Sequence, residues 1–231
     1  VKFLPPMAQV LPIIQKYRVH TVAVEPDSGV ASGDLQSWFT QLPKKIRKNT
    51  EYFLPTKTIR INLTHGTQHI FDNFSEAKRR AVRRAQKNNI HVAESTDIRT
   101  FIGMKNKAAG FLGSVTTFGI DKLWPLCMPK NAAILLAKNG NGEIIGGILL
   151  LFWETIAYYW IAGASREGKS LCAPTLLVWE ALKLAKTRKC RQLDFVGVWD
   201  ERLPTKNEKW KGFTKFKEGF GGTSLYYPLS Q

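Results

Sequence analysis

One lysine near the end of the chain stands among aromatic residues and glycines. Lys217 lies between Phe216 and Phe220 in sequence, and Gly221-Gly222 follows. An ammonium held among apolar groups is a focused positive charge that can stabilise an oxyanion on a carbonyl under attack. Adjacent glycines permit a tight, unusual turn. The tail therefore predicts either an acyl-transfer centre or an ordinary helix end with surface lysines, and residue physics alone favours the second.

A second segment, residues 163–170, satisfies the phosphate-loop pattern GxxxxGK[ST]. That loop needs a parallel strand before it and a helix that opens at its lysine. Here the strand before it belongs to a predicted antiparallel meander, and Pro174 indicates a helix that begins several residues late. We therefore do not expect nucleotide hydrolysis. We interpret the segment as a flexible basic loop, whose Arg166 and Lys169 can still meet a substrate phosphate as point charges.

The same segment bears on coenzyme A. Acyltransferases that use this cofactor usually present a Q/R-x-x-G-x-G/A turn, which directs backbone N–H groups at the pyrophosphate. The chain reads Arg166-Glu-Gly-Lys-Ser there, which breaks the pattern. An acyltransferase with this sequence is expected to use another donor, and we expect no bound cofactor.

The charge of the chain indicates polyanionic partners. Its 231 residues include 34 Lys and Arg against 18 Asp and Glu, a formal net charge of +16 at pH 7. Nucleic acid, phosphorylated substrates and an anionic membrane surface all fit such an excess. Apolar residues make up 44% and charged residues 23%, which excludes a disordered, fibrous or disulfide-rich chain.

Cysteine and histidine give no metal or disulfide pattern. Cys127, Cys172 and Cys190 are not in CxxC spacing, and the four His form no HExxH motif. Such sparse cysteine favours a reducing compartment. No secretory signal opens the chain, and its longest apolar stretch, residues 144–153, is about half a membrane span. We therefore expect a cytoplasmic protein without a metal, which at most rests on the inner face of the membrane.

Periodicity predicts the elements that must position these residues. An antiparallel meander in the last hundred residues leads into one parallel crossover, which is the order of the Gcn5-related acyltransferase (GNAT) fold, a mixed α/β class. Helices are predicted over 7–17, 35–42, 71–88, 174–187 and 209–217, with another after residue 97 that Gly110 interrupts, and strands over 21–24, 58–63, 132–137, 144–152, 155–161, 192–196 and 224–228.

The helix predicted over 71–88 is too basic to be buried on most sides. Its cations are expected to form either a solvated face or a surface for phosphates. They include Lys78, Arg79, Arg80, Arg83 and Arg84, around an inward stripe of Phe74, Ala77, Ala81 and Ala85.

Six motifs run through most of the chain. They are Phe53-Leu-Pro-Thr-Lys-Thr58 with Ile61-Asn-Leu63, the basic run Arg79–Ala85 with residues 88–92, Tyr158-Tyr-Trp160 through Gly163-Ala-Ser165, Pro174 with Leu177, Trp179 and Glu180, Leu193-Asp-Phe-Val-Gly197, and Gly212-Phe213 with Phe216-Lys217 and Phe220-Gly-Gly222. Each motif is weak alone, but their joint order and spacing is specific. It resembles the Fem family, the non-ribosomal peptidyltransferases that build peptidoglycan cross-bridges.

The resemblance implies a tandem pair of GNAT-like domains that moves an amino acid from aminoacyl-tRNA to the stem peptide of a peptidoglycan precursor, carried on a lipid or a nucleotide. It places Phe216 and Lys217 at the acyl-transfer centre. Asp194 is a candidate general base, although a buried structural aspartate fits equally well. The basic helix would bind tRNA phosphates, with Lys211 as an addition. Tyr158, Trp160, Arg166 and Lys169 would contact substrate, although core packing is the commoner role for such aromatics.

The sequence departs from the family in two places. Its first residues look like the middle of the family's first domain, so we expect an incomplete N-terminal domain over residues 1–64 and a complete C-terminal one over 65–231. Ser114 and Phe118 stand where family members often carry Arg or His and then Tyr. Two other functions fit the sequence: a GNAT-type acyltransferase with another donor or acceptor, and a non-catalytic module that binds RNA or an anionic surface.

Overall fold

The computed structural model describes residues 3–48 and 52–229. Its contacts divide the chain into two compact units. The first comprises Val1–Thr58, Gly197–Lys211 and Ser224–Gln231, and the second comprises Ile59–Val196 and Gly212–Thr223. These units are interleaved along the chain, unlike the division predicted between residues 64 and 65. That division concerns sequence domains rather than contact units and stays a prediction.

Residues 3–48 of the first unit contain two short helices and two short strands. They are α1 (Met7–Lys16), β1 (Thr21–Val22), α2 (Ser32–Thr40) and β2 (Arg47–Lys48), with β1 and β2 paired in parallel. Leu35, Trp38 and Phe39 of α2 form their buried core. The indole N–H of Trp38 donates to the carbonyl of Pro5 at 2.7 Å, which satisfies the one polar atom of this buried ring.

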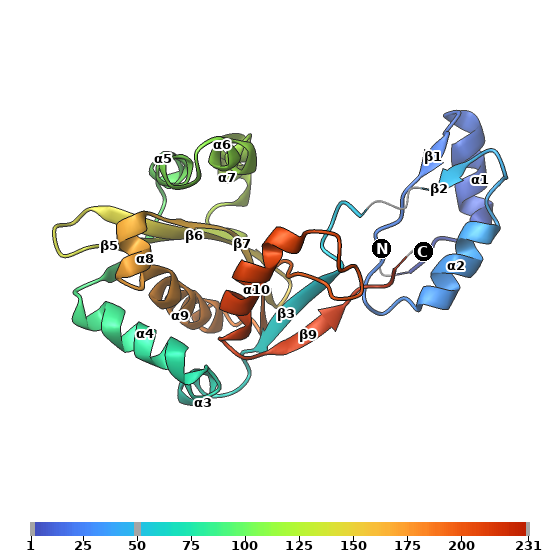
Figure 1. The fold of residues 1–231 in the computed structure, drawn as a ribbon. Helices are drawn as coiled ribbons and strands as arrows, with labels where there is room; N and C mark the ends of the chain where they lie inside the picture. The colour runs from blue at the N-terminus through green and yellow to red at the C-terminus, as the bar shows by residue number, and fades with distance from the viewer. Residues whose placement is uncertain (1–2, 49–51, 230–231) are drawn as a thin grey trace. The chain divides into compact units, whose positions relative to one another are not determined.

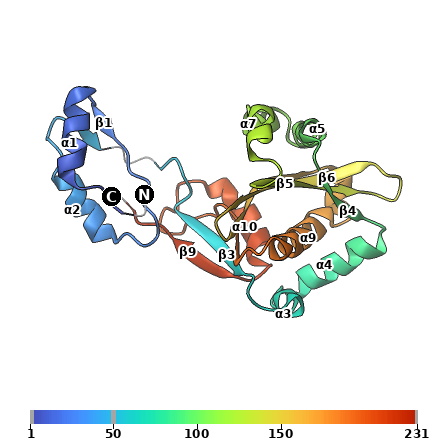
Figure 2. The ribbon, with the colours of Figure 1, turned by 180° about the vertical axis from the view of Figure 1, so that it is seen from behind.

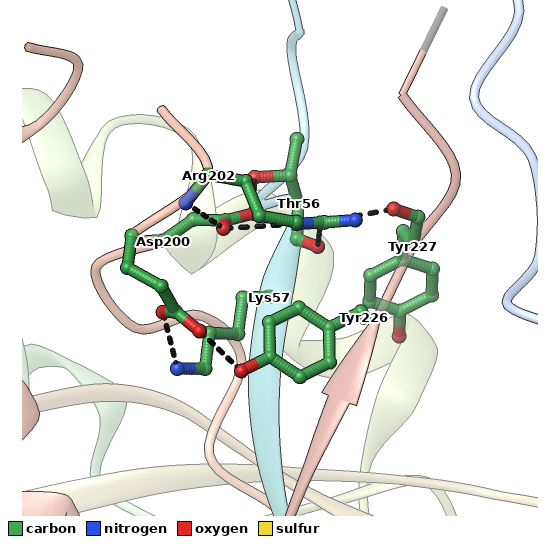
Figure 3. A network of polar contacts seen from close by, with 7 residues as sticks. Thr56, Lys57, Asp200, Arg202, Tyr226 and Tyr227 are labelled. Atoms are coloured by element: carbon green, nitrogen blue, oxygen red, sulfur yellow. Dashed lines mark hydrogen bonds and ion pairs between the residues drawn. The ribbon is translucent and has the colours of Figure 1, made fainter. Parts of the chain in front are cut away.

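A network of charges ties three later segments of the first unit together (Figure 3). The guanidinium of Arg202 pairs with Asp200 at 2.7 Å and donates to the carbonyl oxygens of Thr56 at 2.8 Å and Tyr227 at 3.0 Å. Beside it, Lys57 Nζ pairs with Glu201 at 2.6 Å. These contacts hold residues 56–57, the loop after residue 197 and residues 226–227 in one arrangement.

The larger structure is a seven-stranded mixed sheet in the order β4-β5-β6-β7-β8-β3-β9 (Figure 1). The β4–β5, β5–β6, β6–β7 and β8–β3 pairs are antiparallel, and β7–β8 is parallel. The predicted meander with one parallel crossover, and with it the mixed α/β GNAT-like fold class, is confirmed. The strands are β3 (Lys57–Asn62), β4 (His91–Ser95), β5 (Ala132–Lys138), β6 (Ile144–Trp153), β7 (Ile156–Ala164), β8 (Gln192–Asp194) and β9 (Thr223–Tyr226).

Helices cover both faces of the β4–β7 part of this sheet, as Figures 1 and 2 show from opposite sides. On one face lie α5 (Ile98–Ala109), α6 (Phe111–Thr117) and α7 (Ile120–Cys127). Phe101 and Trp124 pack there against Ile134, Leu149 and Ile161 of the strands. On the other face lie α9 (Ala173–Thr187) and α4 (Glu76–Lys87). Burial of apolar side chains on both faces stabilises the sheet.

Two of the predicted elements are wrong in detail. The helix predicted over 71–88 is two helices, α3 (Thr67–Asp72) and α4, because Ser75 accepts a hydrogen bond from the N–H of Lys78 and starts α4 afresh. Its inward residues are Val82 and Ala85, whereas Ala77 is exposed. The loop predicted over 163–170 contains a short helix, α8 (Arg166–Ser170), which is too brief to show periodicity. The remaining helical elements are η1 (Glu208–Trp210) and α10 (Lys211–Glu218).

Helix α8 lies so close to β6 that one of its residues must be glycine. A Cβ added at Gly168 would lie 2.1 Å from the carbonyl oxygen of Ile145. We expect Gly168→Ala to destabilise the protein by about 3 kcal/mol, because backbone on both sides must shift. Gly103→Ala on α5 is the control: an added Cβ meets nothing within 4 Å. It should stabilise the protein by about 0.5–1 kcal/mol. Urea unfolding followed by circular dichroism measures both, and equal effects would contradict this packing.

Candidate active site

The two parallel strands β7 and β8 pair over only three residues and then part. Their register runs from Ile156–Gln192 to Tyr158–Asp194, after which β8 ends while β7 continues to Ala164. On its other side β7 carries a bulge, because Trp160 is the unmatched residue between the Leu150–Tyr159 and Leu149–Ile161 pairs. A bulge bends its strand and increases its twist. The bulge therefore lies where β7 leaves β8, and it helps to keep the two strand ends apart.

The ammonium of Lys217 meets the backbone just beyond the end of β8. Its Nζ donates to the carbonyl oxygen of Phe195 at 2.8 Å, and the side chain is on the last turn of α10. The ring centroids of Phe213 and Tyr159 lie 4.7 Å and 5.7 Å from Nζ. Lys217 is only 8% exposed. Burial lowers its pKa to about 8, against the opposing charge of Asp194, so at pH 7 the group is mostly protonated.

The rings beside this ammonium are not the sequence neighbours Phe216 and Phe220. Consecutive helical residues point about 100° apart, so Lys217 shares a face with Phe213, four residues earlier. Phe216 packs edge-on against Phe220, with ring centroids 5.1 Å apart. The structure thus keeps the expected ammonium among aromatic rings but supplies different rings. One of them belongs to Tyr159, for which the sequence predicted no role at the site.

Lys78 lies against the other side of the tail motif. Its Nζ is 3.7 Å from the ring centroid of Phe216 and 5.0 Å from that of Phe220. A Cβ at Gly219 would lie 2.7 Å from Lys78 Cε, so a larger residue at that position would displace this flexible side chain. Burial lowers the pKa of Lys78 to about 8. Lys78 is thus half-buried over aromatic rings, which differs from the solvent-facing position predicted for a phosphate contact.

Asp194, the candidate base, is buried and held by two donors. Its Oδ2 accepts from Arg60 Nε at 2.7 Å, and its Oδ1 accepts from the N–H of Val196 at 2.8 Å. These contacts fix the chain at the end of β8, which is the segment that presents the carbonyl of Phe195. The geometry therefore gives Asp194 a clear positioning role.

The predicted substrate contacts lie along β7 and on α8. Tyr158 is half-buried, Trp160 is 36% exposed at the bulge, and Arg166 and Lys169 are exposed. Lys169 lines a cavity of about 160 Å³ together with Tyr159 and Leu177. Tyr159 thus lines this cavity and also faces the ammonium of Lys217.

A half-buried lysine, which no sequence signal marked, also lies beside β7. Lys105 Nζ donates to the carbonyl oxygen of Ala162 at 2.7 Å. Burial, and then the charge of Lys169, lower the pKa of Lys105. A carbonyl on β7 and one just past β8 are therefore each bound by a lysine from a helix.

The phosphate-loop match has the wrong geometry for nucleotide hydrolysis. Helix α8 opens at Arg166 rather than at Lys169, and the N–H of Gly168 donates to the side chain of Ser165 at 3.0 Å. The strand before the loop, β7, pairs antiparallel with β6, and its parallel pairing with β8 ends at Tyr158, well before the loop. A P-loop uses such N–H groups for phosphate, so the expectation against that activity fits the structure.

The other predicted tRNA contacts have mixed environments. Arg79 donates to the carbonyl oxygens of Asp72 and Phe74, both at 2.6 Å, and so caps α3. Lys211 belongs to the first unit and pairs there with Glu208 at 2.8 Å. Arg80, Arg83 and Arg84 remain exposed on α4 with Lys87, although Arg80 also pairs with Glu76 at 3.2 Å. We call these four exposed residues the α4 basic face.

Within residues 3–48 and 52–229, no group of three or more His, Cys, Asp or Glu side chains is arranged to hold a metal ion. In the same residues, no helix has both the length and the apolar composition needed to cross a bilayer.

Comparison with known proteins identifies the fold. The family model described as "Acetyltransferase (GNAT) domain" matches residues 72–212. A search of curated proteins found no match. Among solved structures, FemX aligns with a TM-score of 0.64 at 17% identity, covering 78% of this chain and 61% of FemX. L-PGS from Bacillus licheniformis aligns with a TM-score of 0.59 at 12% identity, covering 97% of this chain and 73% of that chain.

A third solved structure, a conserved protein of unknown function from Bacteroides thetaiotaomicron, has a TM-score of 0.60 at 10% identity, with 95% and 72% of the two chains covered. The chain spans about three fifths of the length of FemX. At these identities the likeness shows the fold. The predicted resemblance to the Fem family is confirmed at that level.

The two lysines on either side of the tail motif should titrate far below ordinary lysines. We expect Lys78 and Lys217 to show pKa values of about 8 in an NMR titration of ¹³Cε-labelled lysine, because both ammonium groups are desolvated. Lys217→Ala should remove one of the two signals that titrate near pH 8, and Lys78→Ala should remove the other. If every lysine signal titrates near 10.5, these side chains are more hydrated than the structure indicates.

Proposed function

Because the chain belongs to the GNAT acetyltransferase domain family, we propose that it is an acyltransferase and, more narrowly, that it moves an aminoacyl group from aminoacyl-tRNA to an amine on the stem peptide of a peptidoglycan precursor. The observation that carries this proposal is the buried ammonium of Lys217 where β7 and β8 part. The fold shared with FemX supports the choice of reaction. Charged tRNA is a cytoplasmic substrate, so the proposal includes a cytoplasmic location.

The proposed chemistry needs one focused positive charge. The nitrogen of the acceptor amine attacks the ester carbonyl carbon of the aminoacyl-tRNA, and negative charge develops on the carbonyl oxygen. An amide C–N bond forms, the C–O bond to the terminal ribose breaks, and the proton lost by the amine ends on the ribose oxygen. Lys217 would stabilise the developing oxyanion from a site that is mostly shielded from water, where such a charge acts strongly.

Other residues would position that ammonium and the substrates. The carbonyl of Phe195 fixes Nζ, and Asp194 with Arg60 fixes the segment that carries this carbonyl. We keep Phe216 as a proposed part of the centre, acting through its packing against Phe220 and Lys78. Tyr158 and Trp160 stay proposed acceptor contacts. Lys169 and Arg166 stay proposed contacts of a phosphate near the end of the donor.

The tRNA would bind through phosphates on the α4 basic face. Proteins read helical RNA chiefly through its backbone and shape, so exposed arginines on one helix suffice for a non-specific contribution. Lys78, Arg79 and Lys211 were proposed for the same surface. Their intramolecular contacts favour supporting roles instead, since Lys78 covers Phe216 and Arg79 caps α3.

Acetyl transfer from coenzyme A is the alternative, because the matched family description names an acetyltransferase. Two features disfavour it. The turn before α9 lacks the usual Q/R-x-x-G-x-G/A sequence, and the N–H of Gly168 is engaged by Ser165. Acetyl-coenzyme A therefore belongs in every activity assay as a competing donor.

Replacing Lys217 should separate chemistry from binding. We expect Lys217→Ala to lower the rate of aminoacyl transfer at least about 100-fold, since it removes the charge that stabilises the oxyanion. Affinity for tRNA should stay within about twofold. Mass spectrometry of lipid-linked and nucleotide-linked precursors incubated with charged tRNA measures transfer. Lys183→Ala, on the surface of α9, is a matched control that should keep full activity.

Two results would overturn this assignment. Undiminished transfer by Lys217→Ala would show that Lys217 is not part of the acyl-transfer centre. Acetylation of an amine by acetyl-coenzyme A, with no transfer from any charged tRNA, would establish the alternative reaction.

Reversing charge on the α4 basic face should weaken tRNA binding without altering the chemistry. We expect Arg80→Glu, Arg83→Glu and Arg84→Glu together to weaken binding at least about tenfold and to reduce its salt dependence, because fewer counterions are released. Lys44→Glu with Lys45→Glu, two exposed lysines outside α4, is the control. Filter binding over a range of salt measures both. Losses that scale only with the number of charges reversed in each variant would show that only total charge matters.

A further inference from the structure

Helix α6 has an inverted distribution of side chains: it buries small or polar residues and exposes large apolar ones. Its buried residues are Gly113 and Thr117, which face α5: the hydroxyl of Thr117 donates to the side chain of Asn106 at 2.9 Å, and a Cβ at Gly113 would lie 2.8 Å from Asn106 Cα. Its large apolar side chains point outward instead. Phe111 is 82% exposed, Leu112 70% and Val115 57%. A surface helix normally does the opposite.

The exposed apolar surface continues beyond α6. Phe118, directly after the helix, is 91% exposed, and Leu126 on α7 is 80% exposed, while Leu123 is about half exposed. Ile120 and Trp124, on the same helix, are buried in the core and anchor it. We call Phe111, Leu112, Val115, Phe118, Leu123 and Leu126 the α6–α7 patch. Large apolar side chains gathered within sixteen residues and left in water indicate an interaction surface.

Two glycines bracket α6 and set its direction. Gly110 has φ +56° and Gly119 has φ +75°, a backbone region that side chains rarely adopt. They let the chain turn sharply at each end of a seven-residue helix. The inverted face is therefore fixed by backbone turns and by the close approach to α5, and it is not simply the result of a frayed end.

The segment that carries the patch has more exposed cations than carboxylates. Between residues 97 and 130, Arg99, Lys107, Lys122 and Lys130 are exposed, against two exposed carboxylates, Asp97 and Asp121. Exposed cations on the segment that carries the protruding phenylalanines and leucines are complementary to anionic lipid headgroups above an acyl layer. Side chains that are 80–90% exposed stand clear of the protein, which suits insertion into a soft phase better than a close-packed protein interface.

We propose that the α6–α7 patch docks this protein on the surface of an anionic lipid bilayer. The apolar side chains enter the boundary between headgroups and acyl chains, and the four exposed cations contact anionic headgroups. The helices lie on the membrane and do not cross it. The inference rests on exposure and charge alone, so it is independent of the proposed aminoacyl transfer.

Vesicle co-sedimentation of the full chain tests this surface. Vesicles of phosphatidylcholine with about one third phosphatidylglycerol are compared with pure phosphatidylcholine, at low and high salt. We expect at least tenfold tighter binding to the anionic vesicles, weakened by salt. The variant Phe111→Ser/Leu112→Ser/Phe118→Ser should bind at least tenfold more weakly. Because these side chains are exposed, the variant should fold normally, which its circular dichroism checks.

A matched variant removes three exposed apolar residues elsewhere: Ile13→Ser/Phe53→Ser/Leu54→Ser. It should bind vesicles within about twofold of the parent chain. Equal loss in both variants, or no binding of the parent chain to anionic vesicles, would overturn the proposal. Light scattering tests whether a second copy of this chain covers the patch instead. If the parent chain does not bind vesicles but forms a dimer, and only the patch variant disrupts that dimer, the patch is a contact between two copies.

Discussion

The hydrogen bond from the ammonium of Lys217 to the carbonyl of Phe195 is the interaction on which the site depends. Where β8 stops pairing with β7, its chain continues with a buried carbonyl that needs a donor. A buried lysine is an energetically unfavourable donor, because its charge loses hydration. The lowered pKa of Lys217 reflects this loss of hydration energy. The fold thus holds a partly desolvated charge at the end of a parallel strand pair, which is the feature that an acyl-transfer centre requires.

Side chains on two sides of helix α10, together with Phe220 just after it, contribute to this centre. Phe213 and Lys217 face β7 and β8, while Phe216 and Phe220 face Lys78 of α4. The glycines that follow are needed for close approach: a Cβ at Gly222 would lie 2.6 Å from the carbonyl of Arg60, and Gly222 has φ +95°. The same helix α4 that presents the proposed tRNA surface therefore packs against the helix that carries the proposed catalytic lysine. Binding of the donor and placement of the ammonium share one structural support.

Much of the fold was readable from the sequence, because its strands are long and apolar and its meander has a clear hairpin turn. That Lys217 lies among aromatic rings was readable too, although the residues alone favoured an ordinary helix end and only the resemblance to the Fem family pointed to an acyl-transfer centre. Contacts that depend on distant segments were not. Nothing in the sequence pairs Lys105 with Ala162 or places Tyr159 beside Lys217, since these contacts follow from how β7 bends at its bulge. The inverted face of α6 was also missed: the pattern of that helix is apolar, and only its close approach to α5 decides which side is buried.

The central claim is that the protonated form of Lys217 stabilises the transition state of aminoacyl transfer. Its most direct test is the pH dependence of the single-turnover rate, corrected for spontaneous hydrolysis of the aminoacyl ester, in the parent chain and in Lys217→Arg. Since burial lowers the pKa of Lys217 to about 8, deprotonation above that pH removes the charge in the parent chain. The arginine variant keeps its charge, and deprotonation of the acceptor amine raises the rate of both proteins alike, so the ratio of the parent rate to the variant rate should fall above pH 8. A ratio that stays constant through pH 10 would contradict the account.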